Sequence, residues 1–155
     1  GADDARSRGR VIVSEAALRR GVQAAASVFL IAAGMHAAAH YRSYLDRAAE
    51  TPARAALRRT LEAYEVLPAW HASAWTVLCM FSLCFALLLA LAGTAYWWMG
   101  KELPAPRLRP LASASALLCF LGAALVAALH PLPQPVAILG LAGLCFALGS
   151  ALARR

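Results

Sequence analysis

Apolar positions dominate this chain in long runs, and most polar residues lie between those runs. The clearest run extends from Trp70 to Met99, and no charged residue occurs between His71 and Lys101. A helix needs about 20 apolar residues to cross the roughly 30 Å hydrocarbon core of a bilayer, and this run is longer. Its ends carry the aromatic residues typical of two membrane–water interfaces, namely Trp70, Trp75, Tyr96, Trp97 and Trp98. The pattern predicts a transmembrane helix over residues 70–98.

Further apolar runs predict three more spans. Residues 21–41 are uncharged. The alanines that follow their centre also fit the cleavage site of a secretory signal, but we interpret the run as an uncleaved first span. The chain is again uncharged from Leu111 to Ala153, which is too long for one span. Pro131, Pro133 and Pro135 interrupt it, and three prolines in five residues cannot continue a helix. This part therefore predicts spans over 110–130 and 135–153, joined by a tight turn.

The largest polar connection, residues 42–69, contains a predicted surface helix over 52–66. Thr51 followed by Pro52 is a typical helix start, because the threonine caps the free N–H groups and proline needs none at the first helical position. Apolar side chains then recur at helical spacing, at Leu57, Leu61 and Tyr64. This amphipathic pattern is typical of a helix that lies along the membrane interface. The alternative is a helix packed on a soluble partner domain.

Small residues recur along the third and fourth predicted spans at spacings of three and four. Such residues let helix backbones approach closely in lipid, where no hydrophobic force drives helices together. They are Ala112, Ser115, Ala116, Cys119, Gly122, Ala123, Ala127, Gly140, Gly143, Ala147, Ser150 and Ala151. The predicted fold is an all-α integral membrane four-helix bundle, one domain over 1–155, with an extracytoplasmic interfacial helix between spans one and two. Residues 1–13 are polar and basic and predict a mostly disordered tail.

The distribution of Lys and Arg predicts the orientation in the membrane. With four spans, both termini and the loop near residue 105 share one side, which holds ten of the 15 cations: Arg6, Arg8, Arg10, Arg19, Arg20, Lys101, Arg107, Arg109, Arg154 and Arg155. The other side holds Arg42, Arg47, Arg54, Arg58 and Arg59. Because the richer side faces the cytoplasm, both termini are predicted to be cytoplasmic and the 42–69 segment extracytoplasmic.

Composition supports the membrane class and excludes others. Hydrophobic residues make up 61% of the 155 residues and charged residues 15%, whereas soluble domains carry about 25% charged residues. The net charge of +7 does not indicate a nucleic-acid partner, because the basic residues lie beside apolar runs and form no stripe with interleaved aromatics. Cys79, Cys84, Cys119 and Cys145 all lie inside apolar runs, which argues against a disulfide framework.

The four histidines of the chain are all predicted to lie at the extracytoplasmic end. His36 and His40 are one helical turn apart near the end of span one, His71 opens span two and His130 ends span three. Ionisable residues in a membrane indicate function, and imidazole is the commonest neutral metal ligand. The predicted ligands are His36, His40 and His130, with His71 a fourth ligand or a spectator. Copper or zinc suits a chelating cluster, and haem suits two opposed histidines. Interfacial histidines without any cofactor are the alternative.

Other catalytic motifs are absent from the sequence. It has no glycine-rich phosphate loop, no GxSxG and no CxxC. The HxxxH pair resembles the first box of membrane di-iron desaturases, but the later HxxHH boxes are absent. The leading hypothesis is therefore an accessory or assembly subunit of a larger membrane complex, of redox type, with other membrane subunits or further copies of itself as partners. The alternatives are a stand-alone metallo- or haem-protein with redox or hydrolytic activity, and an oligomeric channel or carrier. Whether the protein is an enzyme stays open.

The layout of residues 22–152 resembles that of small bacterial four-span membrane proteins of uncharacterised function. The resemblance lies in a histidine late in span one, His36, and in an aromatic-rich stretch before span two, from Tyr64 to Trp75. A short proline-containing turn between spans three and four completes it. The resemblance implies the fold and a bacterial inner membrane. It implies no activity and no functional residues.

Overall fold

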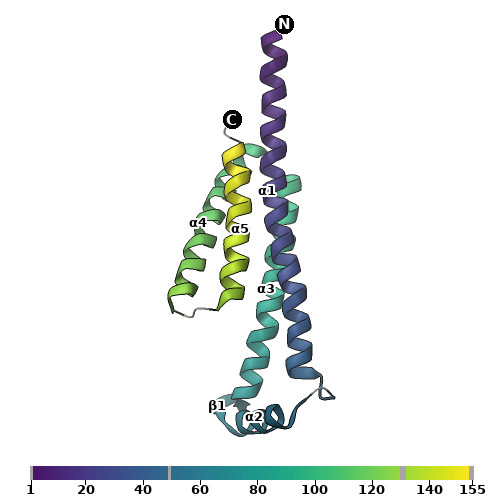
Figure 1. Cartoon of the computed structure of the whole chain (residues 1–155), viewed down its shortest axis with the longest axis vertical. Helices are drawn as coiled ribbons and strands as arrows, with labels where there is room; N and C mark the ends of the chain where they lie inside the picture. Colours follow the sequence, from purple (N-terminus) through teal and green to yellow (C-terminus); the bar gives the residue numbers. More distant parts are fainter. Residues whose placement is uncertain (1, 49, 130–131, 154–155) are drawn as a thin grey trace. The chain divides into compact units, whose positions relative to one another are not determined.

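The computed structural model describes residues 2–48, 50–129 and 132–153, with side chains from residue 14 onward. Figure 1 shows the course of the chain. Its elements are α1 (Ala2–His40), a π-helical turn η1 (Tyr41–Leu45), α2 (Pro52–Ala63), β1 (Glu65–Leu67), a 3-10 turn η2 (Pro68–Trp70), β2 (Ala72–Ser73), α3 (Ala74–Glu102), α4 (Ala105–Leu129) and α5 (Pro133–Leu152). The fold is almost entirely helical, as the sequence predicts.

Four helical segments in the described part of the chain are long and apolar enough to cross a membrane. They are Ser14–Leu45, Ala74–Glu102, Ala105–Leu129 and Pro133–Leu152. These match the four predicted spans, 21–41, 70–98, 110–130 and 135–153, with ends that differ by a few residues. The predictions of an all-α fold and of four helices able to cross a membrane are confirmed.

The structure differs from the sequence prediction at two places. Helix α1 begins at Ala2, where a mostly disordered tail over 1–13 was predicted. Extending an existing helix gains one hydrogen bond per residue with no new nucleation, and the apolar segment that follows supplies the nucleus. The surface helix ends at Ala63 and the second span begins at Ala74, so residues 64–66 and 70–73, which were predicted to be helical, lie in a β-hairpin and its base.

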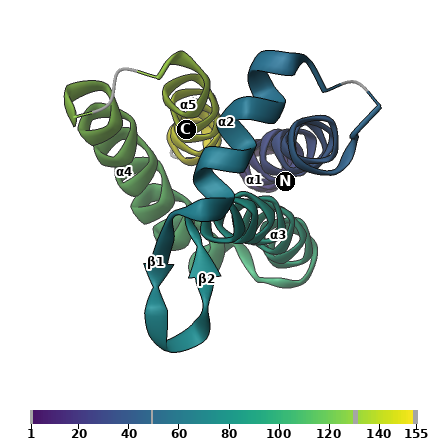
Figure 2. The same cartoon turned by 90° about the horizontal axis from the view of Figure 1, so that it is seen from below.

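Proline at position 68 accounts for the hairpin. A residue before proline is restricted to extended conformations, and Leu67 has φ −124° and ψ 82°. The two strands pair antiparallel, with Glu65 opposite Ser73 and Leu67 opposite Ala72. Between them His71 adopts the left-handed conformation, with φ 48°, and its N–H donates to the Pro68 carbonyl at 3.2 Å. Figure 2 shows the resulting two-stranded ribbon.

The chain forms two compact units, the first up to Ile31 and from Leu91 onward, the second from Ala32 to Ala90. In the first unit, α1 and α5 run antiparallel and touch through glycines. A Cβ added to Gly21 would lie 2.6 Å from Gly149 Cα and 2.7 Å from the Cys145 carbonyl oxygen. Such distances are too short for any side chain, so the two backbones are in direct contact.

Helices α4 and α5 lie side by side as an antiparallel pair (Figures 1 and 2). A Cβ on Gly143 would lie 3.0 Å from the ring of Phe120 and 3.2 Å from Cys119 Cβ. The predicted small-residue stripe is buried in the first half of α4, at Ala112, Ser115, Ala116 and Cys119, and in part in α5, at Gly143 and Ser150. It ends before Ala127, which is exposed.

Large side chains fill the core of the first unit. Phe146, Leu18, Leu108 and Val22 are the largest fully buried side chains of the described residues. At its edge the Arg19 guanidinium donates to the carbonyl oxygens of Gly100 and Lys101, at 2.7 and 2.9 Å, and pairs with Glu15. A cation at this position satisfies the free carbonyl groups at the end of α3 and interacts favourably with the helix dipole.

Candidate functional site

The candidate site lies in the second unit, where the last turns of α1 meet the first half of α3. His36 is half-buried there, and its Nε2 lies 3.1 Å from Ser82 Oγ on α3. The imidazole ring of His36 packs edge-to-face with the ring of Phe85, with 5.0 Å between the ring centroids. Both contacts join α1 to α3. Ser82 is the one hydroxyl residue between Thr76 and Thr94, and the sequence reasoning did not single it out, although a lone serine in an apolar run is a readable signal.

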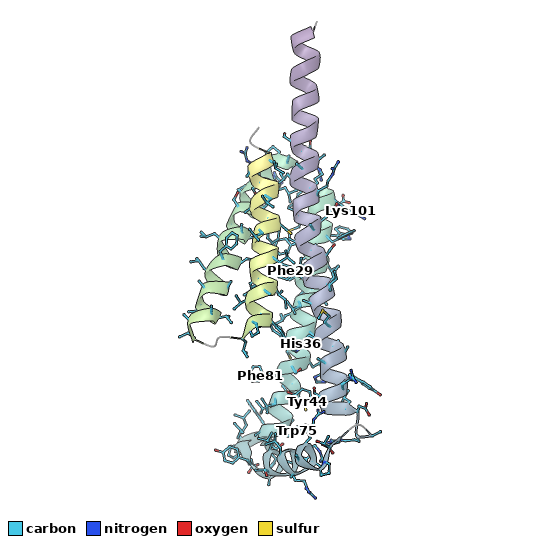
Figure 3. The ribbon with its side chains drawn as sticks, viewed as in Figure 1. Phe29, His36, Tyr44, Trp75, Phe81 and Lys101 are labelled. Carbon is cyan, nitrogen blue, oxygen red and sulfur yellow. The ribbon has the colours of Figure 1, made fainter. Side chains whose placement is uncertain are left out.

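His40, Tyr44, Trp75 and Arg47 form a stack that connects the end of α1 with the start of α3. The ring of Tyr44 lies 5.1 Å from the ring of His40 and 5.1 Å from that of Trp75. The Arg47 guanidinium lies over the Trp75 ring, 5.8 Å from its centroid. Figure 3 shows Tyr44 and Trp75 next to each other. Aromatic and cation–π contacts of this kind stabilise a pair of helices.

A π-helical turn, η1, follows α1 at this stack. The Asp46 N–H donates to the Tyr41 carbonyl at 2.9 Å, five residues back, so the turn is wider than an α-helical one. Single π-helical turns inserted in α-helices are frequent at functional sites. Here the wider turn lies directly after His40 and carries Tyr44 on it.

His40 has an unusual environment. It is only 8% exposed, and its Nδ1 has no hydrogen-bond partner among the described residues. A buried polar atom without a partner costs about 1–3 kcal/mol, and most buried polar atoms in proteins have one. A group bound at this site would therefore supply the partner that the His40 Nδ1 lacks.

The structure gives the described histidines separate contacts. His71 lies on the hairpin, where its Nδ1 is 3.1 Å from Glu65 Oε1 and its side chain is almost fully exposed. His130 lies outside the described residues. No group of three or more His, Cys, Asp or Glu side chains in the described part of the chain is arranged to hold a metal ion. The predicted ligand set of His36, His40, His71 and His130 stays a prediction.

An ion-pair network stabilises the segment between the first two spans. Arg58 on α2 donates to both carboxylate oxygens of Glu50, at 2.9 and 3.2 Å, and to Glu62 at 2.9 Å. The hydrogen bond from Arg58 lowers the pKa of Glu50 below its ordinary value, and the bonds to Glu50 and Glu62 raise the pKa of Arg58. Arg54 donates to the Ser43 carbonyl at 2.9 Å. Thr51 caps α2 as predicted, accepting from the Arg54 N–H.

Acid should loosen this segment. Because the pKa of Glu50 is lower in the folded protein than in the unfolded chain, its contact with Arg58 stabilises the fold above the ordinary glutamate pKa of about 4.3, and this contribution disappears as the pH falls through the folded-state value. We expect the hydrogen-exchange protection of α2, corrected for intrinsic exchange rates, to decrease when the pH is lowered below about 4.3. Glu50→Gln should remove this dependence, and Glu102→Gln, at the end of α3, should keep it. An unchanged profile in Glu50→Gln would contradict the assignment.

Comparison with protein-family models, with curated proteins and with solved structures finds no match.

Proposed function

We propose that this protein is a small accessory or assembly subunit of a larger membrane complex, of redox type, in a bacterial inner membrane. In this proposal the four spanning helices close into a bundle with both termini in the cytoplasm, and α2 lies along the extracytoplasmic surface. Its partners are the lipid bilayer and other membrane subunits or further copies of the chain.

The observation that supports this role is the use of the polar groups within the spans. His36 contacts Ser82 between α1 and α3, and Tyr96 contacts Ser115 between α3 and α4 at 2.8 Å. Interhelical hydrogen bonds of this kind stabilise helix association in lipid. A catalytic centre needs several polar groups that converge on one reacting atom, whereas these groups form pairs that join one helix to another.

The surface of α3 supports the same role. Only 11% of the most apolar stretch of α3 is buried, whereas 33% of the corresponding stretch of the segment Ser14–Leu45 is buried. Large side chains such as Phe81 project from α3 (Figure 3). Such a surface is suited to contact with lipid and with the apolar spans of neighbouring subunits.

Gentle extraction tests this proposal. The tagged protein, expressed in its own host and extracted into nanodiscs with its lipids, should copurify with other membrane subunits at fixed stoichiometry. Native mass spectrometry should then give a mass well above the 16.4 kDa of one chain. A colourless monomer that copurifies with nothing would contradict the accessory role.

The buried Nδ1 of His40 favours a second candidate function, a metallo- or haem-protein. A ligand that binds His40, one helical turn from His36, would satisfy the polar atom that lacks a partner. Copper, zinc and haem each bind imidazole. His130 would complete the ligand set, and the exposed His71 would take no part.

Metal analysis and absorption spectroscopy of the purified protein test this second candidate. We expect stoichiometric copper or zinc, or a haem absorption band, that is lost in His36→Ala, His40→Ala and His130→Ala. It should be retained in His71→Ala, which serves as the matched control. Protein that contains no metal and no haem after purification from its own host would contradict this function and leave the accessory role unaffected.

A further inference from the structure

The β-hairpin between α2 and α3 exposes a cluster of apolar side chains. Trp70 is 77% exposed and Tyr64 67%, and Val66 and Leu67 are exposed beside them. Single exposed apolar residues are ordinary in proteins. Here four of them lie within seven consecutive residues of one short element, which we call the hairpin tip (Tyr64, Val66, Leu67 and Trp70). Figure 2 shows the two strands and the turn that carry it.

Backbone contacts fix the hairpin tip in shape. The Ala74 N–H donates to the Tyr64 carbonyl at 2.8 Å, which joins the base of the hairpin to the first residue of α3. The left-handed His71 closes the turn, and its ring contacts Glu65 across the strands. The backbone that carries Trp70 is therefore held in one conformation, so little backbone entropy is lost when the tip binds.

Chain length limits how far the hairpin tip can lie from the membrane. Trp70 precedes Ala74, the first residue of α3, by only four residues. An extended chain covers at most about 3.6 Å per residue, so Trp70 lies within about 14 Å of the start of a helix that crosses the bilayer. The headgroup layer is therefore the apolar–polar boundary within reach, and it is present whatever other proteins are bound.

The residue types fit that boundary. Tryptophan and tyrosine are enriched where the hydrocarbon core meets the headgroups, because each has an apolar ring and one polar atom. Val66 and Leu67 add purely apolar side chains. Arg59, on the neighbouring helix α2, is exposed and has no ion pair among the described residues, so it can attract anionic headgroups.

We propose that the hairpin tip inserts into the boundary between headgroups and acyl chains of the bilayer that α3 crosses, and so holds the segment between the first two spans against the membrane surface. The occupant of this surface is lipid. The proposal does not depend on the accessory role, on a bound metal or on which side of the membrane the segment lies.

Fluorescence in reconstituted vesicles tests the proposal. A variant with Trp75→Phe, Trp97→Phe and Trp98→Phe leaves Trp70 as the only tryptophan. In vesicles of phosphatidylcholine with phosphatidylglycerol, we expect Trp70 emission to be blue-shifted, to lose most of its intensity with lipids brominated near the glycerol end of the acyl chain, and to resist aqueous iodide. Quenching by iodide without quenching by brominated lipid would overturn the proposal, because the tip would then lie in water. Protection from both quenchers would also overturn it, because protein would then cover the tip.

A second measurement avoids any disturbance from the Trp75 substitution. 5-Fluorotryptophan incorporated into the unaltered chain gives one ¹⁹F resonance for each of the four tryptophans, and Trp70→Phe identifies its signal by loss. In nanodiscs, spin-labelled lipid should broaden this resonance more than an aqueous gadolinium complex does. The reverse order would contradict insertion. Leu67→Ser should reduce the lipid effect, whereas Leu152→Ser, at an exposed leucine that ends α5, should leave the Trp70 signal unchanged.

Discussion

Gly21→Ala should lower the free energy of unfolding of this protein, although alanine is the better helix former. The new methyl group would lie 2.6 Å from Gly149 Cα and 2.7 Å from the Cys145 carbonyl oxygen. Both are backbone atoms, so no side-chain rotation relieves the clash and α1 must move away from α5. Overpacking costs about 1–3 kcal/mol, and the gain in helix propensity is about 1 kcal/mol. We expect a net loss of up to about 2 kcal/mol. Gly149→Ala should cost less, because its added Cβ would lie 3.0 Å from Gly21 Cα and 3.2 Å from the Leu18 carbonyl oxygen.

Each of these helices carries its own control. Gly34 on α1 and Gly140 on α5 have no atom within 4 Å of an added Cβ. Gly34→Ala and Gly140→Ala should therefore keep or raise stability, by up to about 1 kcal/mol. Unfolding by SDS in mixed micelles, followed by circular dichroism, measures all four variants. Equal effects at Gly21 and Gly34 would contradict direct contact between the α1 and α5 backbones.

The four spans could be predicted from the sequence because a transmembrane helix needs about 20 apolar residues. A run of that length is easily recognised. The start of α2 was also predicted, because Thr51 caps the helix and Pro52 is favoured at its first position. The hairpin after α2 was missed, since Pro68 reads as a stop and not as the centre of a turn. The extension of α1 to Ala2 was missed because a polar, basic composition does not show how far a helix extends beyond the apolar segment that nucleates it.

The candidate site shows a different limit. Sequence spacing places His36 and His40 on one face of a helix and puts Tyr44 one turn after His40. It does not reveal that His36 contacts Ser82 on α3, or that Tyr44 contacts Trp75. Contacts between helices depend on local geometry, which is why four histidines predicted to share one membrane face did not by themselves define a ligand set.

Tyr96 combines hydrogen bonding and packing in the first unit. Its hydroxyl lies 2.8 Å from Ser115 Oγ on α4, and its ring lies 4.8 Å from that of Phe146 on α5 and 6.1 Å from that of Phe29 on α1. One residue of α3 thus contacts the three other helices of the unit. When helices separate in lipid, this ring stays in an apolar medium, so the transfer term of a soluble core is absent and the loss of packing remains.

Tyr96→Ala should therefore cost about 2–4 kcal/mol, below the upper values for aromatic deletions in soluble cores. Trp98→Leu is the control on the same helix, because Trp98 is largely exposed, and it should change stability by less than about 0.5 kcal/mol. SDS titration of both variants, followed by circular dichroism, measures the difference. Equal losses would show that Tyr96 packs no better than an exposed aromatic residue.

Tyr96→Phe separates the hydroxyl from the ring. Interhelical hydrogen bonds in membrane proteins average about 0.6 kcal/mol and reach about 1.7 kcal/mol, so Tyr96→Phe should cost an amount in that range while the ring contacts with Phe146 and Phe29 persist. Ser115→Ala should cost a similar amount. The double variant should cost less than the sum of the two, because both single changes remove the same bond. Strictly additive losses would mean that the two hydroxyl groups do not interact across α3 and α4, and that the ring of Tyr96 alone joins these helices.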